Sequence, residues 1–159
     1  LINFRMISNT SPIIFFTKIN KLELLSRLYS NIIITKEVED ELLSNNKPDS
    51  ELIKRAIKEN LISVKSPSND LDLSLGKGEN SAINLALELK DQLIIDDSRG
   101  IRVAQSLGIE TLRTTSVILS AVRKKVITKK EALDLINKII EKGYYISVRY
   151  YKELIDKLI

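Results

Sequence analysis

The chain has 159 residues, of which 43% are hydrophobic and 29% charged, and this size and balance fit one globular domain with a single core. It contains no cysteine and no histidine. That absence excludes a disulfide framework, a thiolate nucleophile, a zinc site of the Cys or Cys/His kind and an imidazole base. The net charge of +4 permits a polyanionic partner without requiring one.

No apolar run reaches the roughly 20 residues that a membrane-spanning helix needs. The first residues also lack the apolar stretch and cleavage site of a signal peptide. We therefore expect no membrane partner and a cytoplasmic location. Any chemistry must use carboxylates, amines, hydroxyls and a bound metal, and these groups suit Mg²⁺ or Mn²⁺ better than softer cations.

Along the chain, the apolar pattern alternates between strands and helices. Short apolar runs predict strands at 6–9, 31–35, 61–65, 93–97 and 110–113. Helical spacing predicts helices at 13–19, 22–28, after Thr35, and at 50–60, 79–90, 99–107, 116–125, 129–142 and 147–158. This order predicts an α/β fold, a three-layer α/β/α sandwich around a mainly parallel sheet of four or five strands. We expect residues 6–127 to form the domain and 128–159 a helical extension packed on it.

Polar residues follow two of the predicted strands. Asn9 follows the first, and Asp96 and Asp97 end the strand near residue 95. In parallel sheets the working site lies at the carboxyl ends of the strands. Two adjacent carboxylates repel each other unless a cation, a helix N-terminus or solvent relieves them. One of the pair can instead cap the helix that begins near Arg99, an interpretation that suits Asp96 better than Asp97.

Two further acids lie on predicted helices. Glu79 follows Gly76-Lys77-Gly78 at the start of an apolar helix, where a negative charge is favourable in any case. That loop lacks the Lys-Ser/Thr ending of a phosphate-binding loop, so we exclude nucleotide binding there. Glu41 shares a helix with Glu37 and Asp40 and, taken alone, fits a solvated surface acid.

Taken in order, these residues resemble the PIN-domain family. The segments that carry the resemblance are Asn9-Thr10-Ser11-Pro12, Val38-Glu39-Asp40-Glu41, Gly76-Lys77-Gly78-Glu79 and Leu93-Ile94-Ile95-Asp96-Asp97. The similarity spans about residues 6 to 127 and is greatest to a poorly characterised prokaryotic branch of VapC-like toxin relatives. It implies a PIN-like fold.

In that family, acids from distant parts of the chain hold one or two Mg²⁺ or Mn²⁺ ions that hydrolyse RNA. The resemblance therefore implies catalytic roles for Glu41, Glu79 and Asp97. It implies metal ligands at Asn9, Glu41, Glu79 and Asp97, with Asp96 beside them, and a supporting hydroxyl at Ser11. The implied partners are RNA, a second copy of the chain in a homodimer and, for the toxin of a toxin-antitoxin pair, an antitoxin protein.

Basic and aromatic residues supply candidate RNA contacts. Arg99 and Arg102 directly follow Asp97, and Lys77 precedes Glu79, although each alone also fits a solvated helix face. The pairs Tyr144-Tyr145 and Tyr150-Tyr151 can stack on bases, or they can pack on the domain or on a second subunit.

One position departs from the family pattern, because Asn9 stands where an aspartate is usual. An amide oxygen still coordinates a hard cation, but the site loses one negative charge and with it metal affinity. The sequence therefore predicts a metal-dependent ribonuclease. It leaves open a catalytically weakened or inactive PIN-like domain that binds nucleic acid or a protein partner.

Overall fold

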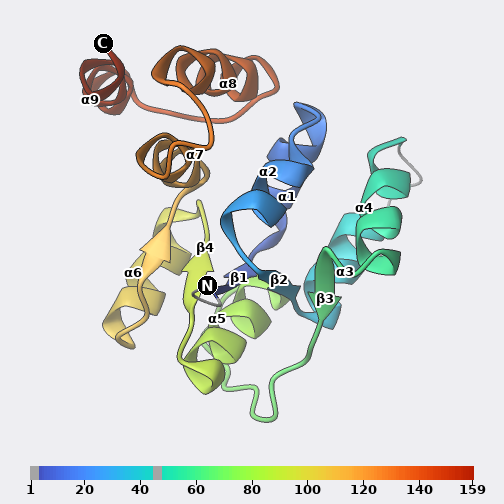
Figure 1. The fold of residues 1–159 in the computed structure, drawn as a ribbon. Helices are drawn as coiled ribbons and strands as arrows, with labels where there is room; N and C mark the ends of the chain where they lie inside the picture. The colour runs from blue at the N-terminus through green and yellow to red at the C-terminus, as the bar shows by residue number, and fades with distance from the viewer. Residues whose placement is uncertain (1–3, 45–47) are drawn as a thin grey trace.

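A central parallel sheet organises the protein, as the computed structural model shows for residues 4–44 and 48–159 (Figure 1). The strands are β1 (Arg5–Ser8), β2 (Asn31–Ile34), β3 (Ile62–Val64), β4 (Gln92–Ile94) and β5 (Thr111–Leu112). They form one five-stranded sheet in the order β3-β2-β1-β4-β5, and every neighbouring pair is parallel. The predicted α/β class and parallel sheet are confirmed.

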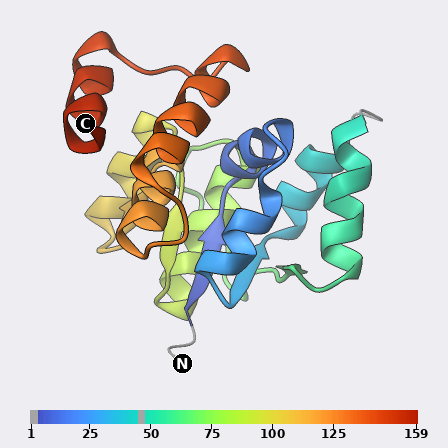
Figure 2. The same cartoon turned by 45° about the horizontal axis from the view of Figure 1, so that its top comes forward.

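Helices cover both faces of this sheet. The first six are α1 (Thr10–Lys18), α2 (Leu22–Leu28), α3 (Lys36–Leu43), α4 (Pro48–Lys58), α5 (Lys77–Leu89) and α6 (Ser98–Ser106). In Figure 2, α1 and α2 lie in front of the sheet, whereas α5 lies behind it. This arrangement agrees with the right-handed crossovers that join parallel strands.

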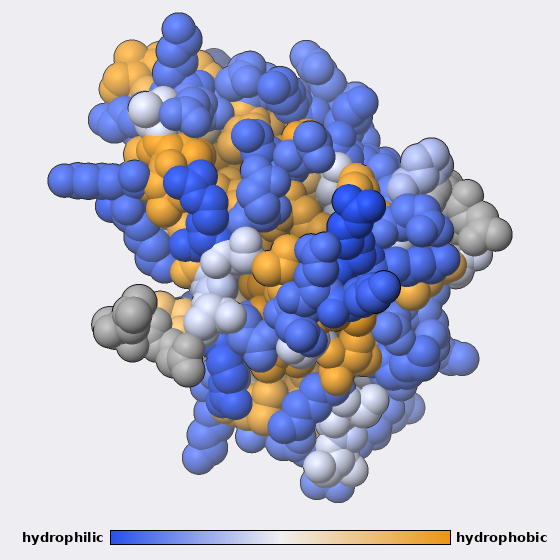
Figure 3. Space-filling view, turned by 45° about the vertical axis from the view of Figure 1, so that its right-hand side comes forward, coloured by the Kyte–Doolittle hydropathy of each residue, from blue (hydrophilic) through white to orange (hydrophobic). Residues whose placement is uncertain are grey.

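The core consists of the strand side chains and the helix faces that pack on them. Ile32, Ile33 and Ile34 of β2 are 1%, 4% and 0% exposed, so this strand is buried on both faces, as its unbroken apolar run predicts. Phe16 of α1 and Ile83 of α5 are fully buried. In the face shown in Figure 3, hydrophilic side chains dominate and hydrophobic ones are visible between them.

The chain ends in three helices that pack on one another, α7 (Thr114–Arg123), α8 (Lys129–Glu141) and α9 (Val148–Leu158). A capping box between Thr128 and Glu131 starts α8, which satisfies two backbone N–H groups at that end. The apolar side of α8 packs on α7 and α1. None of the helices within the described ranges has the length and apolar character that crossing a bilayer requires.

The strand order reverses direction between β1 and β4. The chain runs from β1 outward through β2 to β3, then returns to place β4 on the other side of β1. In open α/β sheets such a reversal leaves a crevice at the carboxyl ends of the two strands. The backbone N–H of Asn9, after β1, donates to the carbonyl of Ile94 in β4 at 2.9 Å. Asn9 and the residues after β4 therefore meet at this crevice.

Candidate functional site

Asn9 occupies the carboxyl end of β1 and is only 5% exposed. Its backbone is extended, and its side chain does not cap α1. The side-chain oxygen Oδ1 is buried and has no hydrogen-bond partner among the described residues. Leaving a buried acceptor unsatisfied costs about 1–3 kcal/mol. A hard cation or an ordered water at this oxygen would remove that cost, so the residue fits a metal ligand.

Glu79 lies in the first turn of α5 and is half-buried. Burial raises the pKa of this carboxyl, and the negative charges of Asp97 and Glu41 raise it further, whereas the positive charge of Arg99 opposes them. The carboxylates of Asp97, at the start of α6, and of Glu41, on α3, therefore both lie within electrostatic reach of Glu79. Such repulsion is relieved when a cation binds between the groups.

Asp97 is the N-cap of α6, because its Oδ2 accepts the N–H of Gly100 at 2.7 Å. The expectation that Asp96 would be the better cap is therefore wrong. A Cβ built on Gly100 would lie 3.4 Å from Asp97 Oδ2 and 3.7 Å from Glu79 Oε2. The two carboxylates thus approach the same point above Gly100, one from α6 and one from α5.

Asp96 has a different role, since its carboxylate accepts three hydrogen bonds. Its Oδ1 accepts the N–H of Thr114 at 2.9 Å and the hydroxyl of Tyr144 at 2.6 Å, and its Oδ2 accepts the Thr114 hydroxyl at 2.7 Å. Its backbone carbonyl accepts Nη1 of Arg113 at 2.9 Å. Asp96 therefore joins the end of β4 to α7 and to the segment after α8. Coordinating a cation would compete with these bonds.

Glu41, on α3, is exposed but held in place. Its Oε1 accepts the backbone N–H of Gly78 at 3.1 Å, and the Thr10 hydroxyl donates to its Oε2. A Cβ on Gly78 would lie 2.5 Å from Glu41 Oε1, so this contact requires glycine. The structure therefore places Glu41 against the first turn of α5, the turn that also carries Glu79.

Five of the predicted site residues line one cleft of about 910 Å³. Its lining includes the predicted residues Asn9, Ser11, Glu79, Asp96 and Asp97, and Glu41 lies outside it. Within the described residues, no three acidic side chains converge closely enough to hold a cation as they stand. Binding would therefore require rotation of flexible carboxylates, which carry the oxygen ligands that Mg²⁺ and Mn²⁺ prefer.

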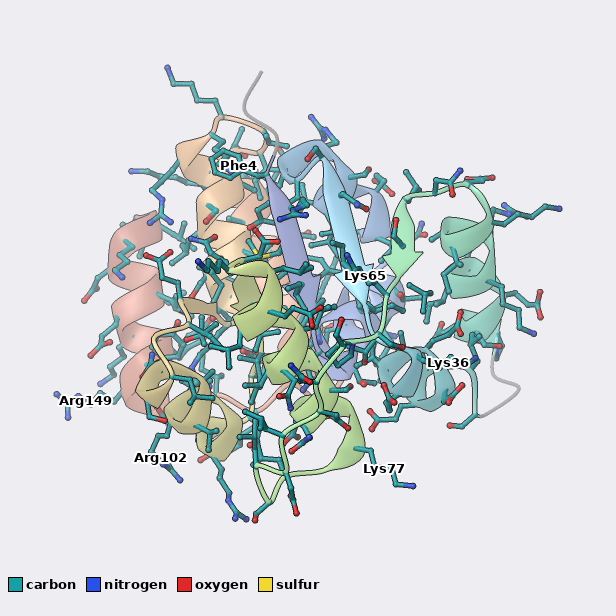
Figure 4. All side chains as sticks on the ribbon, turned by 90° about the horizontal axis from the view of Figure 1, so that it is seen from below. Phe4, Lys36, Lys65, Lys77, Arg102 and Arg149 are labelled. Carbon is teal, nitrogen blue, oxygen red and sulfur yellow. The ribbon has the colours of Figure 1, made fainter. Side chains whose placement is uncertain are left out.

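The three predicted RNA-contacting cations are exposed. Arg99 and Arg102 lie on α6, and Lys77 is the first residue of α5. In Figure 4 the side chains of Arg102 and Lys77 extend outward from these helices. In the parts of the chain that the structure describes, no ion pair is formed by any of the three. Their charges are therefore available to a phosphate backbone.

Sequence reasoning missed the groups that hold the acids in place. They are Thr10 and Gly78 at Glu41, Gly100 at Asp97, and Thr114 and Tyr144 at Asp96. A glycine in the first turn of a helix beside an acid was the available signal at Gly78 and Gly100. The other contacts join residues far apart in the chain and leave no local pattern.

The site combines the switch point of a parallel α/β sheet with carboxylates at the end of a strand and the start of a helix. The family model described as a PIN domain, DUF3368, matches residues 5–159, and the chain belongs to this PIN-domain family. A PilT N-terminus domain protein from the hyperthermophilic archaeon Sulfolobus solfataricus P2 has a similar fold. It is 22% identical, with a TM-score of 0.53 over 75% of this chain and 93% of that chain. No curated protein matches the chain.

Proposed function

We propose that this PIN-domain protein is an Mg²⁺- or Mn²⁺-dependent ribonuclease that hydrolyses phosphodiester bonds of RNA in the cleft between β1 and β4. One observation carries the proposal. Glu79 is half-buried beside the carboxylates of Asp97 and Glu41, and its pKa is raised by burial and by both neighbours. An arrangement that leaves acids in mutual repulsion is typical of sites where a cation supplies the missing charge.

Each residue has a distinct part in this proposal. Asn9 Oδ1, Glu79 and Asp97 would hold the cation, and Glu41 would complete the site from its edge. A divalent cation supplies an activated water and stabilises the charge that develops on the phosphate. Arg99 and Arg102 would attract the phosphate backbone to the cleft. Ser11, which also lines the cleft, would offer a hydroxyl beside Asn9.

The test compares RNA cleavage in chelator and after addition of Mn²⁺. The variants are Glu79→Gln and Asp97→Asn, with Glu59→Gln as a matched control, because Glu59 is exposed and lies beyond α4. Asparagine caps helices as well as aspartate does, so Asp97→Asn keeps the start of α6. We expect chelator-sensitive cleavage that falls by about a hundredfold or more in both site variants and is unchanged in the control.

Three results would contradict the proposal. Cleavage that survives chelation, or that is equal in the wild type and Glu79→Gln, would place the activity elsewhere. RNA binding without cleavage at millimolar Mn²⁺ would instead favour the catalytically inactive binding domain. A toxin role, an antitoxin partner and a homodimer are part of the proposal through the family resemblance alone, and light scattering tests the last of these directly.

A further inference from the structure

The segment that joins α8 to α9 forms part of the wall of the same cleft. Five consecutive residues of this segment line the cleft together with Asn9, Glu79 and Asp97: Gly143, Tyr144, Tyr145, Ile146 and Ser147. The C-terminal helices therefore do more than cover the sheet. They place five consecutive residues beside the carboxylates.

Tyr144 fixes this segment to the end of β4. Its hydroxyl donates to Asp96 Oδ1 at 2.6 Å, and its ring packs edge-on against Phe15 with 5.2 Å between the ring centroids. Tyr144 is only 6% exposed. Further along, the Ser147 side chain accepts the N–H of Tyr150 at 3.1 Å and starts α9. The backbone of the segment is thus held at both ends.

Tyr145 differs from the other tyrosines of the C-terminal part. Tyr150 and Tyr151 direct their hydroxyls to Thr115 and Asn137, and Tyr144 is buried. Tyr145 is 88% exposed, and it forms no hydrogen bond or ring contact with any residue that the structure describes. An aromatic ring held on a fixed backbone and open to solvent can cover a partner with little further loss of conformational freedom.

Cationic side chains extend from two helices, α6 and α9, that both contribute residues to the cleft lining. Arg102 lies on α6 and Arg149 on α9, and Figure 4 shows both extending on the same side of the molecule. The Arg149 contact with Glu153 is a surface pair at 3.7 Å, which holds the arginine only weakly. Positive charge on helices of a cleft that also carries an open aromatic ring suits a ligand with both a phosphate and a planar base.

We propose that Tyr145 stacks on an unpaired nucleobase of the RNA bound in the cleft, so that the base beside the reacting phosphate is held by the C-terminal segment. This inference rests on the proposed function, because it takes RNA as the ligand. The base must be unpaired, since the faces of a base in a duplex are covered by its neighbours. Tyr145 is a substrate-positioning residue, and Tyr144 keeps it in place.

The test is a fluorescence titration of a single-stranded RNA that contains 2-aminopurine, carried out in chelator so that no cleavage interferes. Stacking on Tyr145 quenches this base. We expect Tyr145→Ala to weaken binding by roughly tenfold or more and to abolish the quenching, Tyr145→Trp to retain both, and Tyr145→Leu to restore neither. The matched control is Val148→Ala, because Val148 is 74% exposed but is not part of the cleft lining.

Several outcomes would overturn the proposal. Equal binding and quenching in the wild type and Tyr145→Ala would do so, as would equal losses in Tyr145→Ala and Val148→Ala. A dimer that dissociates in Tyr145→Ala, with RNA binding unchanged, would show that the ring contacts another protein chain.

Cleavage is measured separately and keeps the two proposals apart. If the protein cleaves RNA normally but the quenching does not depend on Tyr145, only the stacking proposal is contradicted. If the quenching depends on Tyr145 but the protein neither cleaves RNA nor binds Mn²⁺, the proposed nuclease activity is contradicted and the contact between Tyr145 and the base is supported.

Discussion

Replacing Gly78 by alanine should separate the stability of the fold from the arrangement of the acids. A Cβ at this position would lie 2.5 Å from Oε1 and 2.7 Å from Oε2 of Glu41, distances that no Cβ tolerates. The obstacle is the far end of a flexible, exposed side chain, so Glu41 can rotate away. The hydrogen bond that Glu41 Oε1 accepts from the backbone N–H of Gly78 at 3.1 Å is then lost.

The two contributions to stability nearly cancel. A hydrogen bond to a charged group contributes about 1.5–3 kcal/mol, but Glu41 is exposed and water can replace it, so the loss lies near or below the lower value. Alanine in place of glycine in a helix stabilises by up to about 1 kcal/mol. We therefore expect the free energy of unfolding to change by no more than about 1 kcal/mol.

Metal binding should respond far more strongly, because Glu41 no longer stands beside Glu79. Loss of a group that orients a metal site lowers affinity by about 10- to 100-fold. Urea unfolding measures the stability, and calorimetric titration with Mn²⁺ measures the affinity. Gly76→Ala is the control, since a Cβ there meets nothing within 4 Å. The reasoning is refuted if Gly78→Ala binds Mn²⁺ as tightly as Gly76→Ala, or if it loses more than about 3 kcal/mol of stability.

Three further changes have directions fixed by the structure. Asn9→Asp adds a carboxylate at a site that is 5% exposed, so the metal-free protein should melt at a lower temperature. Mn²⁺ should bind more tightly because the site gains a negative charge, and weaker Mn²⁺ binding by calorimetry would contradict this. Because burial raises the folded-state pKa of Glu79, its contribution to stability is full below the ordinary glutamate pKa of about 4.3 and is lost as the pH rises through the raised value. Glu79→Gln should therefore be more stable than the metal-free wild type at neutral pH and lose that advantage below about pH 4. A difference in the free energy of unfolding, measured with urea, that does not change with pH would contradict this. Tyr144→Phe removes a hydrogen-bond donor to the Asp96 carboxylate and should lower the free energy of unfolding by about 1.5–3 kcal/mol. Tyr151→Phe should lower it by about 0.5–1.5 kcal/mol, because the partner of Tyr151 is the neutral side chain of Asn137. Equal losses in urea unfolding would contradict a special contribution from the bond to Asp96.

The fold could be predicted because each buried strand is an unbroken apolar run and each helix has apolar residues at helical spacing. The boundaries shifted where polar residues belong to helices. The first helix begins at Thr10, before the first apolar residue of its helical pattern, and the proline expected in its first turn, Pro12, lies there. The strand predicted at 93–97 ends at Ile94, since Asp96 and Asp97 turn away from the ladder to bond other elements.

The candidate site was predictable only as a set of strand ends and helix starts. Asn9, Glu79 and Asp97 carry polar groups at those positions, and the structure brings them to one cleft. The different roles of Asp96 and Asp97 could not be read from two adjacent identical residues. They depend on Thr114 and on Tyr144, which lies 48 residues further along the chain than Asp96, and contacts at that separation leave no mark in the local sequence.

The central claim is that Asn9, Glu79 and Asp97 together hold a divalent cation. An anomalous difference map from crystals grown with Mn²⁺ tests it most directly, because the map locates the ion. The account predicts a peak within about 2.5 Å of Asn9 Oδ1 that also contacts the carboxylates of Glu79 and Asp97, and that disappears in crystals of Glu79→Gln. A map from crystals at millimolar Mn²⁺ with no peak in the cleft, or with its main peak away from these three side chains, would contradict it.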